Sequence, residues 1–227
     1  FTSDNGPEIT GEVNPGAYDR AHQFKHYSMG ELRGAKRDIW EGGHRVPFLA
    51  RWPGHIKAGA VSGETICHVD FLATVAAILG AKLPPSAGED SVSILPVLLG
   101  EKLQSPVREA TVHHSGSGRF AIRKGDWVLI DPPSGDDNGA RGEPPWFKTE
   151  RNYPKDNQPS QLYNVHDDLA ERKNHVAGHP ELVNELKQLL EKYKQDGRST
   201  PGEPQKNDPP YAETNAKPNA PTDPLHK

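Results

Sequence analysis

The sequence predicts a mixed α/β fold, in which the end of an α/β domain precedes a small α+β unit with an antiparallel sheet and one helix. Three observations support this prediction. Residues 1–104 combine extended segments, long loops and a helical segment, short alternating strands follow, and one amphipathic helix begins at Pro180. The predicted units are therefore residues 1–104, residues 105–196, and a proline-rich tail at 197–227.

In the first unit, extended pieces flank a long polar loop. Residues 1–3 are typical of a strand end, and 46–52 of a second strand closed by Pro-Gly. Residues 8–31 follow neither a period of 2 nor one of 3.6, which predicts a long loop of the kind that carries function. Residues 70–79 are apolar between Asp70, a candidate N-cap, and a glycine, which predicts a buried helix.

In the second unit, alternating apolar residues predict short strands, the middle two of them a hairpin, at 110–114, 119–123, 127–130 and 161–165. Residues 131–160 are rich in Pro, Gly and charge and predict a second long loop. Pro180 is well placed at a first helical position. It precedes an apolar stripe at helical spacing, made of Leu182, Val183, Leu186, Leu189, Leu190 and Tyr193. Residues 197–227 carry seven prolines, so we expect a tail, disordered or wrapped on the surface, that buries little.

Composition excludes several classes of protein. The 227 residues include 27 Lys and Arg against 31 Asp and Glu, a net charge of −4. Nucleic-acid-binding domains are usually basic, and scattered cations do not form a polybasic membrane anchor. No apolar run reaches the roughly 18 residues of a membrane-spanning helix. The single cysteine, Cys67, excludes an internal disulfide.

The N-terminal segment resembles neither a chain start nor a leader. Phe1 replaces an initiator Met, and the following residues lack both a basic segment and an apolar segment. We therefore expect the chain to begin inside a longer protein.

Asp4 and Asn5 precede Gly6 at the end of the first extended piece. A carboxylate beside an amide carbonyl offers two hard oxygens, the ligands that Ca²⁺ and Mg²⁺ prefer. Asn-Gly is also a favoured turn pair, so a metal site and a simple turn are both open.

Lys36 follows Arg33 and Gly34 after the long polar loop. A lysine ammonium binds oxyanions as a point charge, and a neighbouring glycine permits close backbone approach. By residue type alone, a solvated surface lysine is the simpler interpretation.

In residues 40–47 two glycines lie between charged and aromatic side chains, which indicates a positive φ or close packing of the backbone there. Glu41 and Arg45 are expected to form a buried ion pair that fixes this loop, since buried charges are normally paired. His44 could face solvent, core or site.

His113 and His114 are adjacent in a predicted strand, so their side chains face opposite sides of the sheet. Only one of them can face a given site, which disfavours a metal site made by both. Cys67 precedes His68 and Asp70, but this spacing does not build a catalytic triad; a small buried side chain is favoured there.

Several motifs in one order resemble the formylglycine-dependent, arylsulfatase-like sulfatases of the alkaline phosphatase superfamily. The matching segments are 2–6, 32–36, 40–47 and 52–54, followed by 119–130, 161–168, Asn174 and the helix from Pro180. The likeness covers roughly residues 1–195 and corresponds to the C-terminal half of such an enzyme. It implies the end of an alkaline-phosphatase-like α/β sandwich domain followed by the small C-terminal sheet and helix.

The resemblance implies specific roles. Asp4 and Asn5 match the later pair of ligands for a divalent metal, usually Ca²⁺ and alternatively Mg²⁺. Lys36 matches a lysine that contacts the sulfate oxygens, as a catalytic and substrate-binding residue. The loops 8–31 and 131–160, with His113 and His114, are candidate substrate-selecting surfaces.

The nucleophile of these enzymes is a formylglycine made from a Cys/Ser-x-Pro-x-Arg motif, which this sequence lacks. Cys67 cannot replace it. The resemblance therefore implies a sulfuric ester hydrolase fragment that is inactive alone, whose complete form acts on a sulfated small molecule or glycan. Location in the periplasm or outside the cell is expected from the family alone.

Two alternatives stay open on the sequence. One is a phosphonate or phosphate monoester hydrolase of the same superfamily. The other is a non-catalytic interaction module, in which Asp4, Asn5 and Lys36 are structural.

Overall fold

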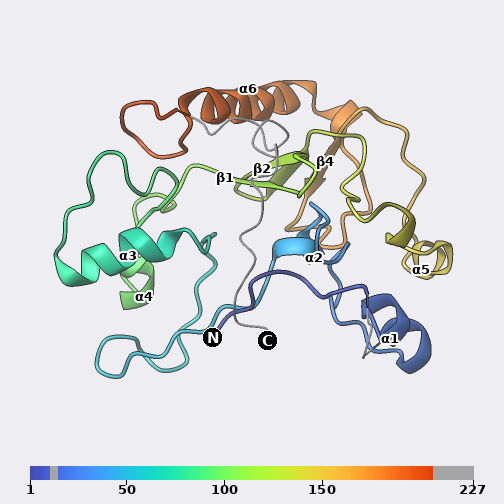
Figure 1. The fold of residues 1–227 in the computed structure, drawn as a ribbon, viewed down its shortest axis with the longest axis horizontal. Helices are drawn as coiled ribbons and strands as arrows, with labels where there is room; N and C mark the ends of the chain where they lie inside the picture. The colour runs from blue at the N-terminus through green and yellow to red at the C-terminus, as the bar shows by residue number, and fades with distance from the viewer. Residues whose placement is uncertain (11–14, 207–227) are drawn as a thin grey trace, which may run out of the picture.

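The computed structural model describes residues 1–10 and 15–206, and Figure 1 shows their arrangement. Its helices are α1 (Ala17–Phe24), α2 (Glu41–His44), α3 (Asp70–Leu79), α4 (Leu95–Leu99), α5 (Pro145–Glu150) and α6 (Pro180–Asp196), with short 3-10 turns η1 (Gly139–Arg141) and η2 (Val176–Gly178). Its strands are β1 (Thr111–His114), β2 (Phe120–Lys124), β3 (Trp127–Ile130) and β4 (Gln161–Asn164).

The strands form one antiparallel sheet in the order β1-β2-β3-β4. The predicted hairpin is confirmed, with Ile122 paired to Leu129, and Leu129 paired in turn to Leu162. These side chains face α6, while Val128 and Tyr163 belong to a second core on the other side. Because both faces are covered, β3 is buried along most of its length.

The α6 helix lies across one face of the sheet, as predicted (Figure 1). Pro180 is its first residue, and Gly197 ends it in the left-handed conformation at φ 61°. Leu186, Leu190 and Tyr193 are buried on its inner side. The apolar stripe read from the sequence is therefore the face that packs on the strands.

The two predicted long loops both contain helices. Residues 8–31 include α1, whose Ala17, Tyr18 and Ala21 are buried, and residues 131–160 include α5, whose Phe147 is buried. The ring of Tyr18 contacts that of Phe147 at a centroid distance of 5.0 Å. The prediction of structureless loops was wrong because these short helices are stabilised against each other across a long sequence separation.

The helix predicted at 70–79 is confirmed as α3, which ends at Gly80 in the left-handed conformation. Asp70 is its first residue rather than the N-cap; its carboxylate accepts hydrogen bonds from the backbone N–H groups of Cys67 and Val92 and pairs with Arg108.

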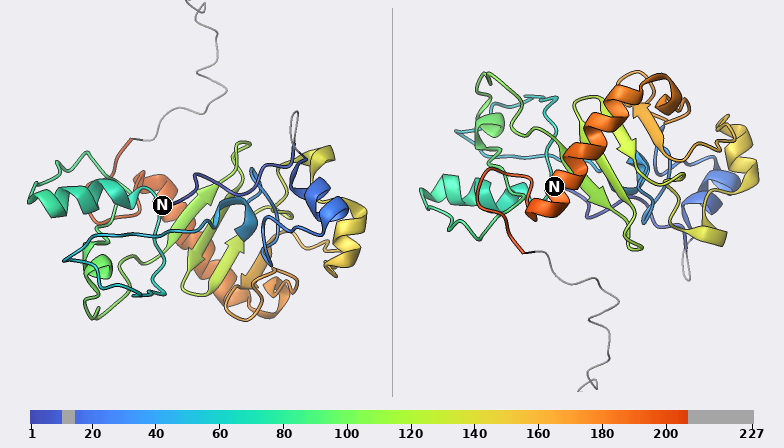
Figure 2. Two further views of the ribbon diagram at one scale, coloured as in Figure 1. Left: turned by 90° about the horizontal axis from the view of Figure 1, so that it is seen from below. Right: turned by 90° about the horizontal axis from the view of Figure 1, so that it is seen from above.

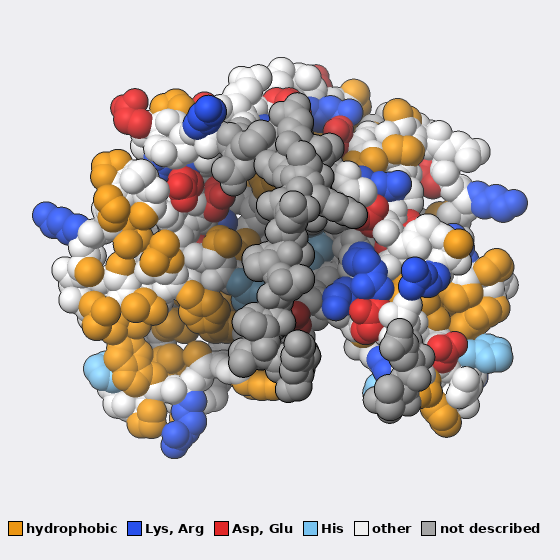
Figure 3. Space-filling view, in the orientation of Figure 1, with side chains coloured by type: hydrophobic (Ala, Val, Ile, Leu, Met, Phe, Trp, Pro, Cys, Tyr) orange, Lys and Arg blue, Asp and Glu red, His pale blue; other side chains and the backbone are white. Residues whose placement is uncertain are grey.

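The expectation that α3 is buried was wrong for one of its faces. Large apolar side chains are exposed there, namely Phe71, Leu72, Val75, Ile78 and Leu79. Figure 3 shows hydrophobic side chains gathered on the α3 side of the molecule.

The strand predicted at 46–52 is absent. In the described part of the chain this extended segment makes only a single bridge, between Thr2 and Phe48, and a strand requires a continued ladder.

The tail packs back on the molecule at its start. Arg198 is 8% exposed, and Thr200 donates its backbone N–H to the carbonyl oxygen of Glu89. The described start of the tail is therefore wrapped on the surface, one of the two expected states, and the expectation that it buries little is corrected only at Arg198, since residues 201–206 are almost all exposed. The continuation of the tail at 207–227 lies outside the described residues. No helix among the described residues has the length and apolar character needed to cross a membrane.

Figure 2 shows α3 and α4 at one end of the sheet and α1 with α5 at the other. Between them, the short helix α2 lies under the sheet face that α6 leaves open (Figure 1). The segments that carry the sequence-predicted site residues meet around α2.

Candidate functional site

Four glycines bring three segments of the chain into close contact around α2. Gly6 donates its backbone N–H to the carbonyl oxygen of Gly43 at 2.9 Å, and Gly42 donates to that of Arg33 at 2.7 Å. A Cβ atom added to Gly6 would lie 1.9 Å from the carbonyl oxygen of Gly42, so no side chain fits there. Gly34, with φ +82°, completes this set, which we call the glycine junction: Gly6, Gly34, Gly42 and Gly43.

The glycine junction places Lys36 beside the segment that carries Asp4 and Asn5. Lys36 donates its backbone N–H to the carbonyl oxygen of Pro7 at 3.0 Å. Asp4 and Asn5 precede Lys36 by 31 residues or more in the sequence. This hydrogen bond brings the two segments together in the fold.

Asp4 and Asn5 direct their side chains toward each other. Asn5 Nδ2 donates to Asp4 Oδ2 at 2.6 Å, and in the described residues neither side chain bonds to anything else. Their remaining oxygens are hard ligands of the kind that Ca²⁺ and Mg²⁺ take, so the donor chemistry fits a divalent cation. Two oxygens fall short of the six to eight that Ca²⁺ needs, and residues 1–10 and 15–206 contain no group of three or more His, Cys, Asp or Glu placed to hold a metal.

Lys36 forms an ion pair with Glu8, at 3.4 Å between Nζ and Oε2. Its side chain is 38% exposed, so it is reachable from solvent. Glu8 is held more tightly by Arg37, whose Nη2 lies 2.5 Å from Oε1. The hydrogen bond from Arg37 lowers the pKa of Glu8 well below its ordinary range, so this carboxylate is charged at neutral pH.

Arg37 has a left-handed backbone at φ 81°, which is strained for a residue with a side chain. Its Nε donates to Asn138 Oδ1 at 2.8 Å, and Asn138 Nδ2 donates in turn to the carbonyl oxygen of Lys36. Asn138 therefore holds the backbone of Lys36 and the side chain of Arg37 together.

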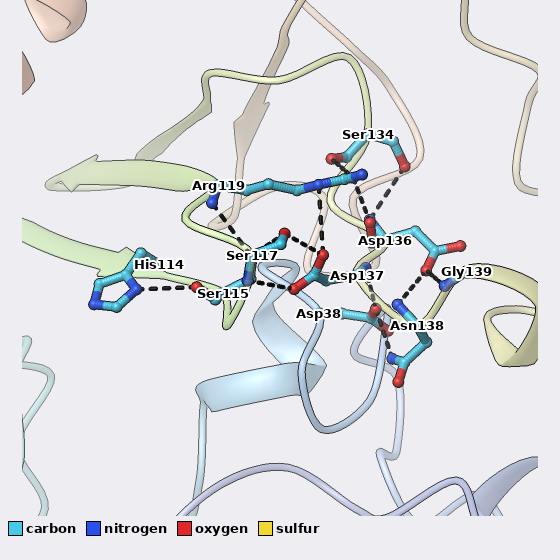
Figure 4. A network of polar contacts seen from close by, with 10 residues as sticks. All are labelled: Asp38, His114, Ser115, Ser117, Arg119, Ser134, Asp136, Asp137, Asn138 and Gly139. Carbon is cyan, nitrogen blue, oxygen red and sulfur yellow. Dashed lines mark hydrogen bonds and ion pairs between the residues drawn. The ribbon is translucent and has the colours of Figure 1, made fainter. Parts of the chain in front are cut away.

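A buried aspartate supports this arrangement from below. Asp38 accepts hydrogen bonds from the backbone N–H of Asp137 and from Asn138 Nδ2 (Figure 4). It also accepts one from the backbone N–H of Ala35. Burial raises the pKa of Asp38 to about 6, against the effect of these hydrogen bonds and with the repulsion of Asp136. The contacts of Asp38 fix the turn that carries Lys36 and Arg37.

The predicted pair of Glu41 and Arg45 forms at 2.9 Å, but it is buried only on one side: the Glu41 side chain is 1% exposed and that of Arg45 is 46% exposed. Arg123 from β2 adds a second ion pair to the same oxygen of Glu41 at 3.2 Å. Two guanidinium groups on one buried carboxylate tie α2 to the sheet, which is a structural role.

The three histidines considered from the sequence lie away from Asp4, Asn5 and Lys36. The rings of His44 and His113 contact each other at a tilt of 41°, with centroids 3.8 Å apart, and line a cavity of about 230 Å³ together with Cys67. Asp4, Asn5 and Lys36 do not line this cavity. His114 faces elsewhere, with Nδ1 bonded to the carbonyl oxygen of Ser115 (Figure 4). Desolvation raises the pKa of the Cys67 thiol, which keeps it protonated. Cys67 is only partly buried, not fully buried as expected.

Sequence reasoning missed Glu8, Arg37 and Asn138, which contact or hold Lys36. The residue types of Glu8 and Arg37 carry no local signal, because charged residues in a polar loop are common. Asn138 lies about a hundred residues further along the chain, and only the fold brings it to Lys36.

Comparison with known proteins gives a consistent result. Residues 1–81 match the Sulfatase family model. The chain is 37% identical over 194 residues to an N-acetylgalactosamine-6-O-sulfatase of Bacteroides thetaiotaomicron, covering 86% of this chain and 35% of that protein. It is 32% identical over 197 residues to human arylsulfatase A, covering 83% of this chain and 36% of that protein.

A solved structure from work on the metabolism of multiple glycosaminoglycans by Bacteroides thetaiotaomicron has the same arrangement. It is 36% identical, with a TM-score of 0.67, over 86% of this chain and 38% of that one. This chain spans about a third of the length of the curated relatives it matches. The matches favour the sulfatase interpretation over the phosphatase and interaction-module alternatives, and they share the predicted alkaline-phosphatase-like α/β fold. From its fold, its motifs and these relatives, the chain belongs to the sulfatase family.

Proposed function

We propose that this chain is the C-terminal part of an enzyme that hydrolyses sulfate monoesters, in which Lys36 contacts the sulfate group and Asp4 and Asn5 contribute to a divalent metal site. The supporting observation is the contact of the Lys36 backbone with Pro7, which brings the lysine beside the Asp4–Asn5 turn. The sulfatase relatives support the reaction class.

The charges around Lys36 suit this reaction. Hydrolysis of a sulfate ester builds negative charge on the sulfuryl oxygens and on the leaving oxygen, and positioned cations stabilise it. Lys36 contributes one such cation, and Arg37 keeps Glu8 in place when Lys36 exchanges its ion pair for a sulfate oxygen. A bound Ca²⁺ or Mg²⁺ supplies Lewis-acid charge to the same group, and the formylglycine nucleophile comes from a motif that this chain does not contain.

A sulfated sugar is the substrate class that we propose. The relative that is 37% identical over most of this chain is named an N-acetylgalactosamine-6-O-sulfatase. The half-exposed Lys36 and the polar surface beside it admit a hydrophilic substrate.

The test is Lys36→Ala in a complete sulfatase chain that carries this segment together with its Cys/Ser-x-Pro-x-Arg motif, assayed on an aryl sulfate. Loss of a positioned donor typically costs about 10²–10³ in turnover, while folding stability should change by less than about 0.5 kcal/mol. Lys36→Arg should restore little, because the guanidinium is wider and planar.

Lys57→Ala is the matched control, because Lys57 is exposed and makes no side-chain contact within the described residues. It should leave turnover unchanged. If Lys36→Ala keeps more than about half of the wild-type turnover, the role given to Lys36 is wrong.

A further inference from the structure

A polar pocket, separate from the cavity of His44 and His113, lies beside the turn that carries Lys36. It has a volume of about 330 Å³ and is lined by Thr10, Arg37, Asp137, Asn138 and Arg141. Every lining side chain is polar, and two are guanidinium groups. These residues come from separate parts of the chain, so the pocket exists only in the folded molecule.

One of the two guanidinium groups is uncompensated. Arg37 is neutralised by Glu8 and bonded to Asn138. Arg141, which follows the same asparagine in η1, is exposed, and its side chain has no hydrogen-bond or ion-pair partner among the residues that the structure describes.

Two of the acidic groups around the pocket are paired with cations. Glu8 lies between Lys36 and Arg37. Asp137 accepts hydrogen bonds from the backbone N–H and the hydroxyl of Ser117 and pairs with Arg119 at 3.5 Å (Figure 4). Asp136, on the same turn, is held by the backbone N–H groups of Asn138 and Gly139 rather than by a cation. Arg141 is therefore the lining guanidinium that has no side-chain partner among the described residues.

The pocket adjoins the turn that carries Lys36, although Lys36 does not line it. Asn138 lines the pocket and donates to the carbonyl oxygen of Lys36 at 2.9 Å, and Arg37 lines it and is the next residue along the chain. The side chains of Lys36 and Arg37 lie close together, because both pair with the carboxylate of Glu8.

We propose that this pocket binds a second anionic group of the substrate, a carboxylate or a further sulfate on the sugar, with Arg141 as the residue that recognises it. This inference rests on the proposed sulfatase function and makes it more specific. A guanidinium presents planar paired donors that match either oxyanion. The preferred substrate is then a sulfated sugar with at least two anionic groups.

The test is Arg141→Gln in the complete sulfatase chain, with kcat and KM measured on four substrates. These are an aryl sulfate, a neutral monosulfated N-acetyl sugar, a disulfated sugar and a sulfated sugar joined to a uronic acid. The wild type should favour one or both of the last two. The substitution should raise KM for the favoured substrate roughly tenfold, which is about 1.4 kcal/mol, with kcat nearly unchanged, because a charge-assisted hydrogen bond at an exposed position is lost. The disulfated and uronate substrates distinguish the two kinds of anion.

Arg51→Gln is the matched control: Arg51 is exposed, lines none of the pockets described here and makes no side-chain contact within the described residues. It should change KM for no substrate. Arg141 is also exposed, so Arg141→Gln should leave the melting temperature unchanged.

The inference is overturned if the wild type does not prefer a doubly anionic substrate, or if Arg141→Gln changes KM equally for all substrates or for none. Failure of the wild type to hydrolyse any sulfate ester would instead contradict the proposed function. The aryl sulfate arm separates these two outcomes, because that substrate has no second anionic group.

Discussion

Two imidazole rings, of His44 at the end of α2 and of His113 in β1, lie against each other in the interior. His44 Nε2 bonds to the carbonyl oxygen of Ile39 at 2.9 Å, while the buried Nε2 of His113 has no hydrogen-bond partner among the described residues. Burial lowers the pKa of both rings, and for His113 the neighbouring His44 and Arg123 lower it further. Both rings are therefore neutral in the folded chain near pH 7.

This predicts a loss of stability on mild acidification. The unfolded chain binds protons at these histidines from about pH 6.5 downward, whereas the folded chain does not. The free energy of unfolding should therefore decrease as the pH falls from 7 to 5. His113→Phe removes one of these groups, so urea unfolding at pH 5, 6 and 7 should show a smaller pH dependence than for the wild type.

Glu171 acts in the opposite direction, because burial raises the pKa of its carboxyl well above the ordinary value. The comparison of His113→Phe with the wild type removes this contribution, since both chains contain Glu171. His26→Phe, at an exposed position, is the control and should leave the pH dependence unchanged. An unchanged slope in His113→Phe would show that His113 does not carry the effect.

At the scale of elements, the glycine junction is the feature that positions the candidate site. It joins the Asp4–Asn5 turn, the Lys36 turn and α2 through backbone hydrogen bonds, with no room for side chains between them. Interiors are packed at crystal density, so a small excess of volume at such a contact displaces backbone.

Gly6→Ala is therefore predicted to destabilise the chain strongly. The new Cβ would lie 1.9 Å from a backbone oxygen, and overpacking of this kind costs about 1–3 kcal/mol or more. Gly63→Ala is the control, because no atom lies within 4 Å of its added Cβ. Urea unfolding measures both. If the two variants unfold alike, the junction does not hold the segments together.

At the scale of the whole molecule, the start of the tail connects α6 to the loop after α3. Arg198 donates to the carbonyl oxygens of Thr200, Pro85 and Glu203. Ser199 adds hydrogen bonds from its N–H and its hydroxyl to Asp90. One buried guanidinium thus holds together parts of the chain that are more than a hundred residues apart.

Arg198→Ala should lower the free energy of unfolding by about 2 kcal/mol, because the partly buried carbonyl groups that Arg198 contacts lose their hydrogen-bond donor. Truncation after Gly197 should lower it further by removing the contacts with Asp90 as well. Thermal unfolding checks both, with Arg51→Ala as the control at an exposed position. Melting temperatures equal to the wild type would restore the expectation that the tail adds nothing to the fold.

The sequence by itself determined the elements whose pattern is local. The strands around the β2–β3 hairpin and the α6 helix follow from alternation and from a stripe at helical spacing, and the structure confirms them. The family also follows from sequence, because the order of its motifs is preserved in the chain. Asp4, Asn5 and Lys36 came from that resemblance, and their functional roles stay predictions.

Only the tertiary structure decided the rest. The α1 helix was missed from the sequence because its apolar face is short, only Ala17, Tyr18 and Ala21, and packs against Phe147, far along the chain. The surroundings of Lys36 also depend on the tertiary structure, because Asn138 and Arg141 belong to a loop about a hundred residues further along the chain. Hydrogen bonds and charge pairs act over a few ångströms in space, whereas the periodicity of a sequence records only neighbours along the chain.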